Sequence, residues 1–428
     1  MKHSVIKGAV AALLGTTILV PAAVAQDDDG AKVTSVYERA RPDFDAPGVR
    51  SGSFLFYPKV VVDAKYDSNI YATDGSEVDD YIAIVKPSFR FASDWNNNFF
   101  SFFADAKLGR YADNGAEDYE DFKVGTSGRV DISRGSSVTM DLSYADEHED
   151  RGSPDNNGAA AEYTKYSLLK AAAGYKRDEG LISFAADGRY EKRDFDDASL
   201  IGGGILNNDD RDREQYWGSV RVGYHMNEDY EAFVKFTTTA VEYVDSREDG
   251  GPLRDSDGWD VVGGAAFKVG GKTEGEVYVG YVKRDFDADI LEDVSDFKFG
   301  ASLLWNATGL TSVRVGVDRT VTETTLSADN GLGVTVPAAG ILSTLYSVSV
   351  EHELQRNLLL RASASYNKMD FVNTVRDDEV TKLGLGAKYL MNRNLALGLN
   401  YSFDNRNTTA LAQDYDRHAV IASLTAQW

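Results

Sequence analysis

Apolar and polar residues alternate along most of this chain, in segments of about ten to fourteen residues separated by polar stretches. In residues 357–370, for example, Leu358 and Leu360 fall in one phase of the alternation, and Arg361 and Ser363 fall in the other. The same alternation recurs in three further segments, 138–146, 381–389 and 395–402. A period of two places alternate side chains on opposite faces of a β-strand, so the pattern predicts a chain built from long strands.

The stretches between these segments are alternately short and long. Tight turns are expected near 95–97, 134–136, 178–180, 227–229, 270–272, 307–309, 355–356 and 392–394. Long loops are expected at 72–79, 112–119, 149–161, 196–211, 245–257, 287–294, 325–340, 371–378 and 405–415. Short turns at one end and long loops at the other are typical of outer-membrane barrels, whose tilted strands need about 9–11 residues to cross a bilayer. The sequence therefore predicts an all-β fold for 53–428, a transmembrane antiparallel up-and-down β-barrel of about eighteen strands, with long extracellular loops and short periplasmic turns.

Aromatic residues lie toward both ends of the predicted strands and form two candidate girdles. Those near the long loops are Tyr66, Tyr144, Tyr190, Tyr281, Tyr366 and Tyr401, and those near the tight turns are Phe91, Tyr175, Tyr224, Trp305 and Tyr389. Two aromatic belts mark the membrane–water interfaces of such barrels. The chain ends in an alternating strand whose last residue is Trp428, an ending common in bacterial outer-membrane proteins, so we expect Trp428 to be the signal for the barrel-assembly machinery.

One short phrase occurs twice, as YEKRDFDD at 190–197 and as YVKRDFDA at 281–288. A tyrosine followed by charges ends most strands that run into a long loop, including the strand with Tyr243, whereas Val317 replaces the tyrosine once. The repeat is about forty residues long, a period that soluble propellers share, but a propeller blade has four short strands instead of two long ones. We expect the tyrosines at the membrane interface and the charges beyond it. Lys192 and Lys283 are expected to contact outer-membrane lipids and lipopolysaccharide.

The chain begins with features of a secretory signal peptide. Lys2 and Lys7 precede an apolar run at about 9–20, and Ala23-Val24-Ala25 is a cleavage site of the A-x-A type. This run is shorter than the roughly 20 residues of a membrane-spanning helix, so we expect residues 1–25 to be removed. Residues 26–52 are polar and irregular, which predicts a periplasmic N-terminal extension or a plug. The sequence has no cysteine, which excludes disulfides and thiolate metal sites.

Charge separates the loops from the inward face of the predicted barrel. The formal net charge is −23, which makes nucleic acid a poor partner, and the acidic surplus lies in the long loops and the N-terminal stretch. The inward face carries both signs with a modest excess of bases, and we expect the following residues to line a pore: Lys59, Asp63, Lys65, Arg90, Asp105, Lys107, Lys123, Arg129, Asp131, Asp141, Asp187, Arg189, Arg221, Lys235, Arg314, Arg361, Lys382 and Lys388. Barrels of 16–18 strands leave an aqueous channel. The alternative is a lumen closed by the long loops or by residues 26–52.

Candidate catalytic and metal-binding residues are few. The sequence has no HExxH, Walker or GxSxG motif, and we predict no catalytic residue, no cofactor and no metal site. The sharpest catalytic alternative is His148 in the stretch DEHEDR, at the base of a loop, because barrel proteases place histidine and acidic residues at such a rim. Asp-rich loops at 207–214 and 246–258 are candidates for calcium, but they lack the EF-hand spacing, and solvated loops are favoured.

Several stretches resemble the putative β-barrel porin 2 family of Gram-negative outer-membrane proteins. They are RARPDFDAPGVRSGSFLFYPKV (39–60), YDSNIYAT (66–73), KPSFRFASDWNNN (86–98) and GRVDISRGSS (128–137). The resemblance implies an outer-membrane barrel, and some members of the family look linked to exopolysaccharide export. We therefore expect a porin-like channel for polar solutes in the cell outer membrane, which is not an enzyme. The alternatives are an exopolysaccharide exporter that uses periplasmic polysaccharide-export proteins and a plugged structural or surface-interaction barrel.

Overall fold

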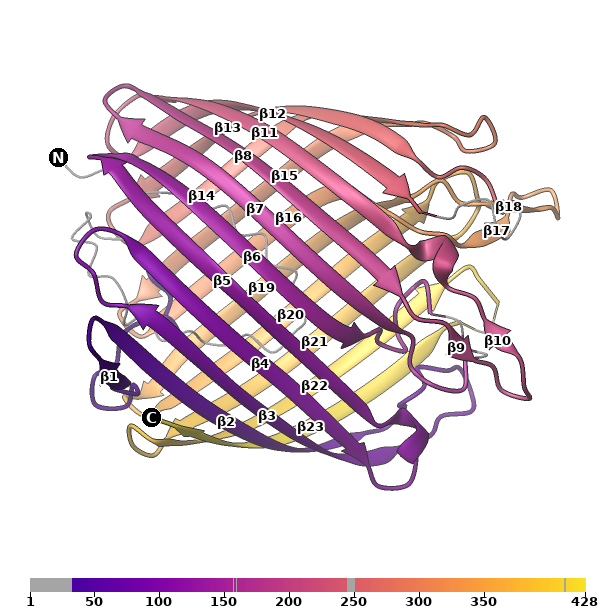
Figure 1. The fold of residues 1–428 in the computed structure, drawn as a ribbon, viewed down its shortest axis with the longest axis horizontal. Coiled ribbons are helices and arrows are strands. Elements are labelled where there is room, and N and C mark those ends of the chain that lie inside the picture. The colour runs from indigo at the N-terminus through magenta and orange to yellow at the C-terminus, as the bar shows by residue number, and fades with distance from the viewer. Residues whose placement is uncertain (1–32, 157, 159, 245–250, 412) are drawn as a thin grey trace.

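The computed structural model describes residues 33–156, 158, 160–244, 251–411 and 413–428, which form a closed β-barrel (Figure 1). One sheet contains nineteen strands, and one of these, β1 (Val49–Ser51), is only three residues long. The eighteen long strands are β2 (Phe54–Asp67), β3 (Asp80–Ser93), β4 (Phe99–Tyr111), β5 (Tyr119–Ser133), β6 (Ser136–His148), β7 (Lys165–Glu179), β8 (Ile182–Phe195), β11 (Arg213–His225), β12 (Tyr230–Tyr243), β13 (Ser256–Val269), β14 (Thr273–Phe286), β15 (Val294–Thr308), β16 (Thr311–Thr322), β19 (Ile341–Gln355), β20 (Leu358–Phe371), β21 (Asp377–Leu390), β22 (Leu395–Thr408) and β23 (Tyr415–Gln427). The predicted signal peptide lies outside the described residues.

Each long strand pairs antiparallel with the next one in the sequence, and the first pairs with the last. The β2–β23 ladder runs from Lys59 opposite Gln427 to Asp67 opposite Ala419. The backbone N–H of Trp428 extends the contact by donating to the carbonyl of Pro58 at 3.1 Å. This closure leaves no free sheet edge within the long strands and confirms the predicted up-and-down barrel.

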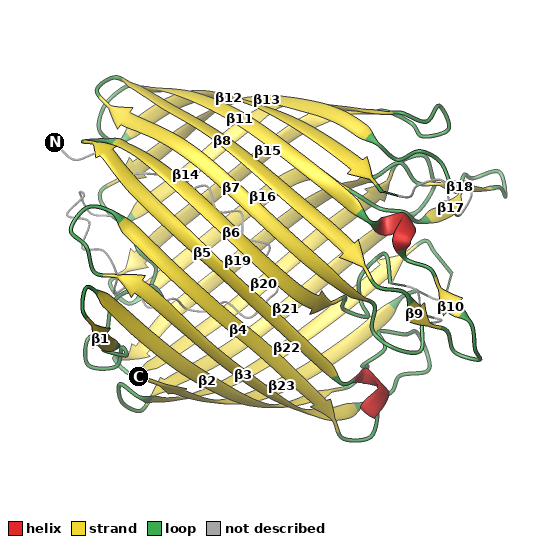
Figure 2. Cartoon of the chain, in the orientation of Figure 1, coloured by secondary structure: helices red, strands yellow, loops and turns green. Residues whose placement is uncertain are grey.

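The two ends of the barrel differ as the pattern of turns and loops predicts. The tight-turn end holds short connections and the C-terminus, whereas the long-loop end holds the short elements η1 (Gly115–Glu117), η2 (Asp209–Arg211), β9 (Ala198–Ser199), β10 (Ile205–Leu206), β17 (Ser327–Asp329) and β18 (Thr335–Pro337). Figure 2 shows the two short helices on that side. Within the described ranges, no helix has the length and apolar character needed to cross a membrane.

Large apolar side chains are exposed on the outer face. Leu383, Leu385, Leu397 and Leu399 are examples on neighbouring strands. The residues predicted to form the girdles all lie in this outward phase, and several pair across strands: the ring centroids of Tyr190 and Tyr216 are 5.2 Å apart. A face of this kind fits a lipid solvent rather than water. The position of these rings at membrane interfaces stays a prediction.

Tyr243 corrects one expectation from the repeated phrase. Its side chain is only 7% exposed, and it faces inward, because its ladder partner Arg213 is in turn the partner of inward-facing Arg193. Val241 lies in the same inward phase and is also buried. At the long-loop end, the inner face of β12 is therefore apolar. The alternation puts Tyr243 in the same phase as inward-facing Lys235, so the repeated phrase, and not the alternation, assigned Tyr243 to the wrong face.

Candidate functional site: the barrel lumen

The inner wall of the barrel is polar and carries both signs of charge. Side chains of residues that face each other across a ladder point to the same side of the sheet. Followed strand by strand from the buried carboxylates of Asp63 and Asp67, the register places every charged residue predicted to line the pore on the inward face. Their role in permeation stays a prediction.

Many of these charges form ion pairs with acids and bases that the sequence alone did not match. Lys86 pairs with Asp63 at 2.5 Å, and Lys382 approaches Asp404 at 3.7 Å. Arg221 bridges two carboxylates and stacks 3.7 Å from the centroid of the Phe233 ring. Others remain apart: within the described part of the chain, Asp141 and Lys235 have no ion pair within 4 Å. The structure therefore divides the predicted residues into paired and unpaired groups.

The described residues of loop 149–164, which connects β6 to β7, reach across the lumen at the long-loop end. The carbonyls of Gly152 and Ser153 lie 3.5 and 3.4 Å from Nη1 of Arg406 on β22, on another part of the ring. Asp155 accepts a hydrogen bond of 2.5 Å from Thr324, in the loop that follows β16. Because β16 and β22 both lie far from β6 in the strand order, the loop narrows the mouth of the barrel.

Three arginines hold this loop in place. Arg151 forms a buried ion pair with Glu117 of η1 at 2.5 Å, and both side chains are at most 2% exposed. Arg211 of η2 binds Glu149 at 2.7 Å. Arg417 on β23 reaches the carboxylate of the loop residue Asp150, 3.2 Å away.

The charge of Asp150 is favoured by its surroundings. Desolvation inside the barrel mouth would raise the pKa of this carboxyl, but its side chain is 65% exposed, and Arg417 and the backbone N–H of Gly152 outweigh the desolvation, so that the pKa of Asp150 lies well below its usual range. The carboxylate therefore stays ionised at neutral pH and keeps its contact with the wall.

His148, the residue behind the enzyme alternative, is enclosed rather than open to a substrate. Its Nδ1 lies 2.6 Å from Asp121, and its ring packs 4.1 Å from Tyr119 and 4.4 Å from Tyr163, measured between centroids. The ring is 11% exposed at the side chain. These contacts give His148 a packing role beneath loop 149–164. Among the described residues, no group of three or more acidic, histidine or cysteine side chains could hold a metal ion.

Small side chains occupy the inward face from β20 to β23. The register places Ser363 opposite Gly384, Arg361 opposite Gly386 and Lys388 opposite Gly398. Glycine and serine are small, but neighbouring polar side chains lie over the glycines: Oγ of Ser363 is 2.7 Å from the position that a Cβ of Gly384 would take.

The N-terminal segment, residues 33–48, lies against the inner wall at the tight-turn end. The backbone N–H of Val36 donates to Ser312 at 2.8 Å, and that of Tyr37 donates to Glu351 at 3.0 Å. Phe44 lies further along the segment, and its carbonyl accepts a hydrogen bond of 3.2 Å from the side chain of Gln427 on β23. The segment thus runs from β16 to β23 and covers part of this mouth.

Apolar packing fixes the same segment. Val36 is fully buried in a cluster with Leu359, Leu390 and Ala396, and Tyr37 and Phe44 pack against it. Burial of a valine side chain contributes about 1.5–3 kcal/mol. The sequence did not single out Val36, and its place in a polar stretch gave no signal of burial.

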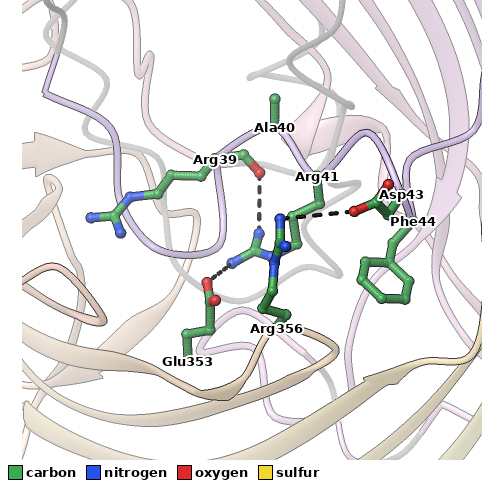
Figure 3. Close-up of a pocket in the computed structure, with 7 residues that line it drawn as sticks. All are labelled: Arg39, Ala40, Arg41, Asp43, Phe44, Glu353 and Arg356. Carbon is green, nitrogen blue, oxygen red and sulfur yellow. Dashed lines mark hydrogen bonds and ion pairs between the residues drawn. The ribbon is translucent and has the colours of Figure 1, made fainter.

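A small cavity of about 170 Å³ lies beside this segment (Figure 3). Its lining residues are Arg39, Ala40, Arg41, Asp43, Phe44, Glu353 and Arg356. Arg41 binds Glu353 at 2.9 Å and donates to the carbonyl of Arg39, while Arg356 extends toward Asp43, 3.8 Å away. Because these contacts use the guanidinium of Arg41, its main role is to attach the segment to β19.

The two lysines of the repeated phrase lie on the outer face of the barrel. Each lies near the aspartate that follows it by two residues in the sequence. Lys283 binds Asp285, and Lys192 is 4.0 Å from Asp194. Their contact with lipopolysaccharide stays a prediction, and any headgroup would compete with these neighbours.

A closed barrel with an apolar outer face and a charged inner face defines an outer-membrane β-barrel. The chain belongs to the Putative beta-barrel porin 2 family, whose profile matches residues 41–428. It is thus a porin-like barrel of the cell outer membrane, and its short turns face the periplasm while its long loops face outward. Membership of a porin family favours a channel over an enzyme.

Several solved structures are similar to this chain. The outer membrane protein OpdK from Pseudomonas aeruginosa is 12% identical, with 87% of this chain and 99% of that chain covered and a TM-score of 0.44. OccAB3 from Acinetobacter baumannii is 12% identical, with the same coverage and a TM-score of 0.43. A mutant of the ferric enterobactin receptor PfeA from P. aeruginosa is 8% identical, covering 90% and 81%, with a TM-score of 0.48. No curated protein matches the chain.

Proposed function

We propose that this barrel is a passive channel for small polar solutes, narrowed at both ends by segments of its own chain. The observation that carries the proposal is the inner wall, where a surface of glycine and serine on β20 to β23 faces charged residues on the other strands. A water-filled pathway needs polar walls of this kind, whereas a barrel stabilised only by packing would fill the space with larger side chains.

The two narrowing segments decide what can pass. Loop 149–164 crosses the extracellular mouth, and the N-terminal segment covers part of the periplasmic mouth. Both segments are held in place by a few hydrogen bonds and ion pairs and not by pairing with a strand of the barrel. A lumen narrowed at both ends favours small solutes over polymers.

Export of a polysaccharide is the first rival function. A polymer needs a wide and continuous lumen, and a loop that contacts β22 as well as the loop after β16 obstructs such a path. Partnership with periplasmic polysaccharide-export proteins is therefore the weaker proposal. A plugged structural barrel is the second rival, and the fully buried Val36 of the N-terminal segment favours it.

Conductance across a planar bilayer separates these functions. The refolded full-length mature chain is expected to give ohmic single-channel currents. A silent wild type whose currents appear when residues 26–48 are deleted would identify a plugged barrel. Silence in both proteins, with correct folding shown by heat-modifiable migration in gels, would reject the channel.

A further inference from the structure

Lys59 on β2 and Lys388 on β21 face the lumen near its periplasmic end without an acidic partner. In the described parts of the chain, neither lysine has an ion pair within 4 Å or a hydrogen bond. Lys388 interacts electrostatically with Lys59 and with Arg41 of the N-terminal segment, and Asp45 is its only acidic neighbour of this kind. Two unneutralised ammonium groups therefore lie close enough to repel each other.

Further cations continue this patch along the wall. Arg90 on β3 and Lys123 on β5 interact with Asp105, as does Lys59, so that one carboxylate lies among three bases. None of them makes an ion pair with it within 4 Å. The Nε of Arg90 is buried and has no acceptor. The acidic charge here is insufficient to neutralise the bases around it.

Arg361 on β20 extends the patch to the other side of the N-terminal segment. It interacts electrostatically with Tyr37 and faces Glu351 across the ladder, yet no ion pair joins Arg361 and Glu351. Glu351 instead accepts the backbone N–H of Tyr37. The basic patch thus comprises Lys59, Arg90, Lys123, Arg361 and Lys388.

Several bases elsewhere in the lumen are matched by acids at short range. Lys298 binds Asp260 at 2.7 Å, and Lys176 binds Asp178 at 2.8 Å. Among the described residues, unpaired bases are therefore grouped at the level of this patch, whereas Asp141 and Lys235 are unpaired charges on other strands. The chain as a whole is acidic, so this patch does not follow from the overall composition.

We propose that the basic patch is a binding site for small anionic solutes, such as carboxylates or inorganic anions, and that it makes the channel anion-selective. This inference rests on the proposed channel function. Rings of lysine and arginine select anions in other pores, and charge-assisted hydrogen bonds to carboxylates are about twice as strong as neutral ones. Because the lysines have no fixed acidic partner in the described chain, a bound anion can also be released.

Reversal potentials in a KCl gradient test the site. At about 0.1 M salt, where charges act over roughly 10 Å, the wild type is expected to favour chloride over potassium, and 1 M salt should weaken the preference. Lys59→Gln and Lys388→Gln should each lower the permeability ratio about twofold or more. Citrate added as a probe should reduce wild-type current and affect the double variant less.

Lys235→Gln is the matched control, because Lys235 is an inward lysine on β12 that also lacks an ion pair in the described chain. It should leave the ratio nearly unchanged. An open channel that prefers potassium, or a Lys235→Gln effect as large as that of the patch variants, would overturn the site while leaving the channel function intact. Absence of current, with or without residues 26–48, would instead reject the channel function itself.

Discussion

Arg417 on β23 binds the carboxylate of Asp67 on β2. Its Nε lies 3.0 and 2.9 Å from the two carboxylate oxygens, and its Nη2 lies 2.8 Å from one of them. Asp67 is fully buried, and Lys65 binds it at 2.7 Å. This multidentate pair lies at the seam where the barrel closes.

Replacement of Asp67 by asparagine is expected to destabilise the closed barrel. The substitution removes the carboxylate charge that both Arg417 and Lys65 bind. Loss of one partner of a buried ion pair lowers the free energy of unfolding by about 3–5 kcal/mol. Urea unfolding in detergent, followed by tryptophan fluorescence, measures the loss. Arg50→Gln is the control, because its pair with Asp94 is solvent-exposed at 61% and 44% and contributes at most about 1 kcal/mol. Equal losses for both variants would contradict the role of the seam.

Loop 149–164 should open when its buried anchor is removed. Glu117→Gln eliminates the charge that holds Arg151, and an arginine that remains buried without a carboxylate favours displacement of the loop. We expect a higher single-channel conductance and faster cleavage of the loop by protease. Glu120→Gln, close by and paired with the exposed Arg110, should change neither property. An unchanged conductance with a cleaved loop would show that this loop does not narrow the pore.

The N-terminal segment should leave the wall when a charge enters its apolar contact. Val36→Asp places a carboxylate among Leu359, Leu390 and Ala396, which removes about 1.5–3 kcal/mol of burial and adds a desolvation penalty. The expected results are proteolytic release of the segment and a larger conductance. Val49→Asp, at a position that is 54% exposed on β1, is the control. Release without any change in current would show that the solute path bypasses the segment.

Asp212, between η2 and β11, gives the loop end a dependence on pH. Burial and the nearby carboxylates of Asp194 and Asp209 raise its pKa to about 6, although the backbone N–H of Phe195 opposes the shift. The folded state therefore holds the proton more tightly than the unfolded chain does. The resulting stability is complete below about pH 4 and is lost as the pH rises through 6.

Hydrogen exchange of residues 196–212 checks this dependence. After correction for the intrinsic rate, protection should be greater at pH 4.5 than at pH 7.5, and Asp212→Asn should remove most of the difference. The same pH dependence in the variant would assign it to another group.

Strand number and turn positions could be predicted because each strand shows one face to lipid, and a period of two records that difference directly. The sequence pattern does not indicate which residue pairs with a charged side chain in the lumen. Arg417 lies in the polar phase of its strand, but nothing local indicates Asp67, 350 residues earlier. Tyr243 illustrates a second limit: Val241 and Tyr243 are buried on the inner wall at the long-loop end, so a tyrosine at the end of a strand does not by itself mark the outer face.

Val36 shows a third limit, since a short irregular segment has no periodicity, and its burial depends on a surface built by distant strands. The same holds for loop 149–164, whose acidic composition is that of a solvated loop. Its contacts come from Arg151, Arg211 and Arg417, two of which belong to other parts of the chain.

The site where the N-terminal segment binds has a consequence for the order of assembly. Residues 33–48 are synthesised before any strand, yet their partners Ser312, Glu351 and Gln427 lie in the last third of the chain. The surface that receives the segment exists only once β16 to β23 have paired. The periplasmic mouth therefore stays uncovered throughout strand insertion and is covered only in a finished barrel, so that protection of this segment from protease is a measure of completed folding.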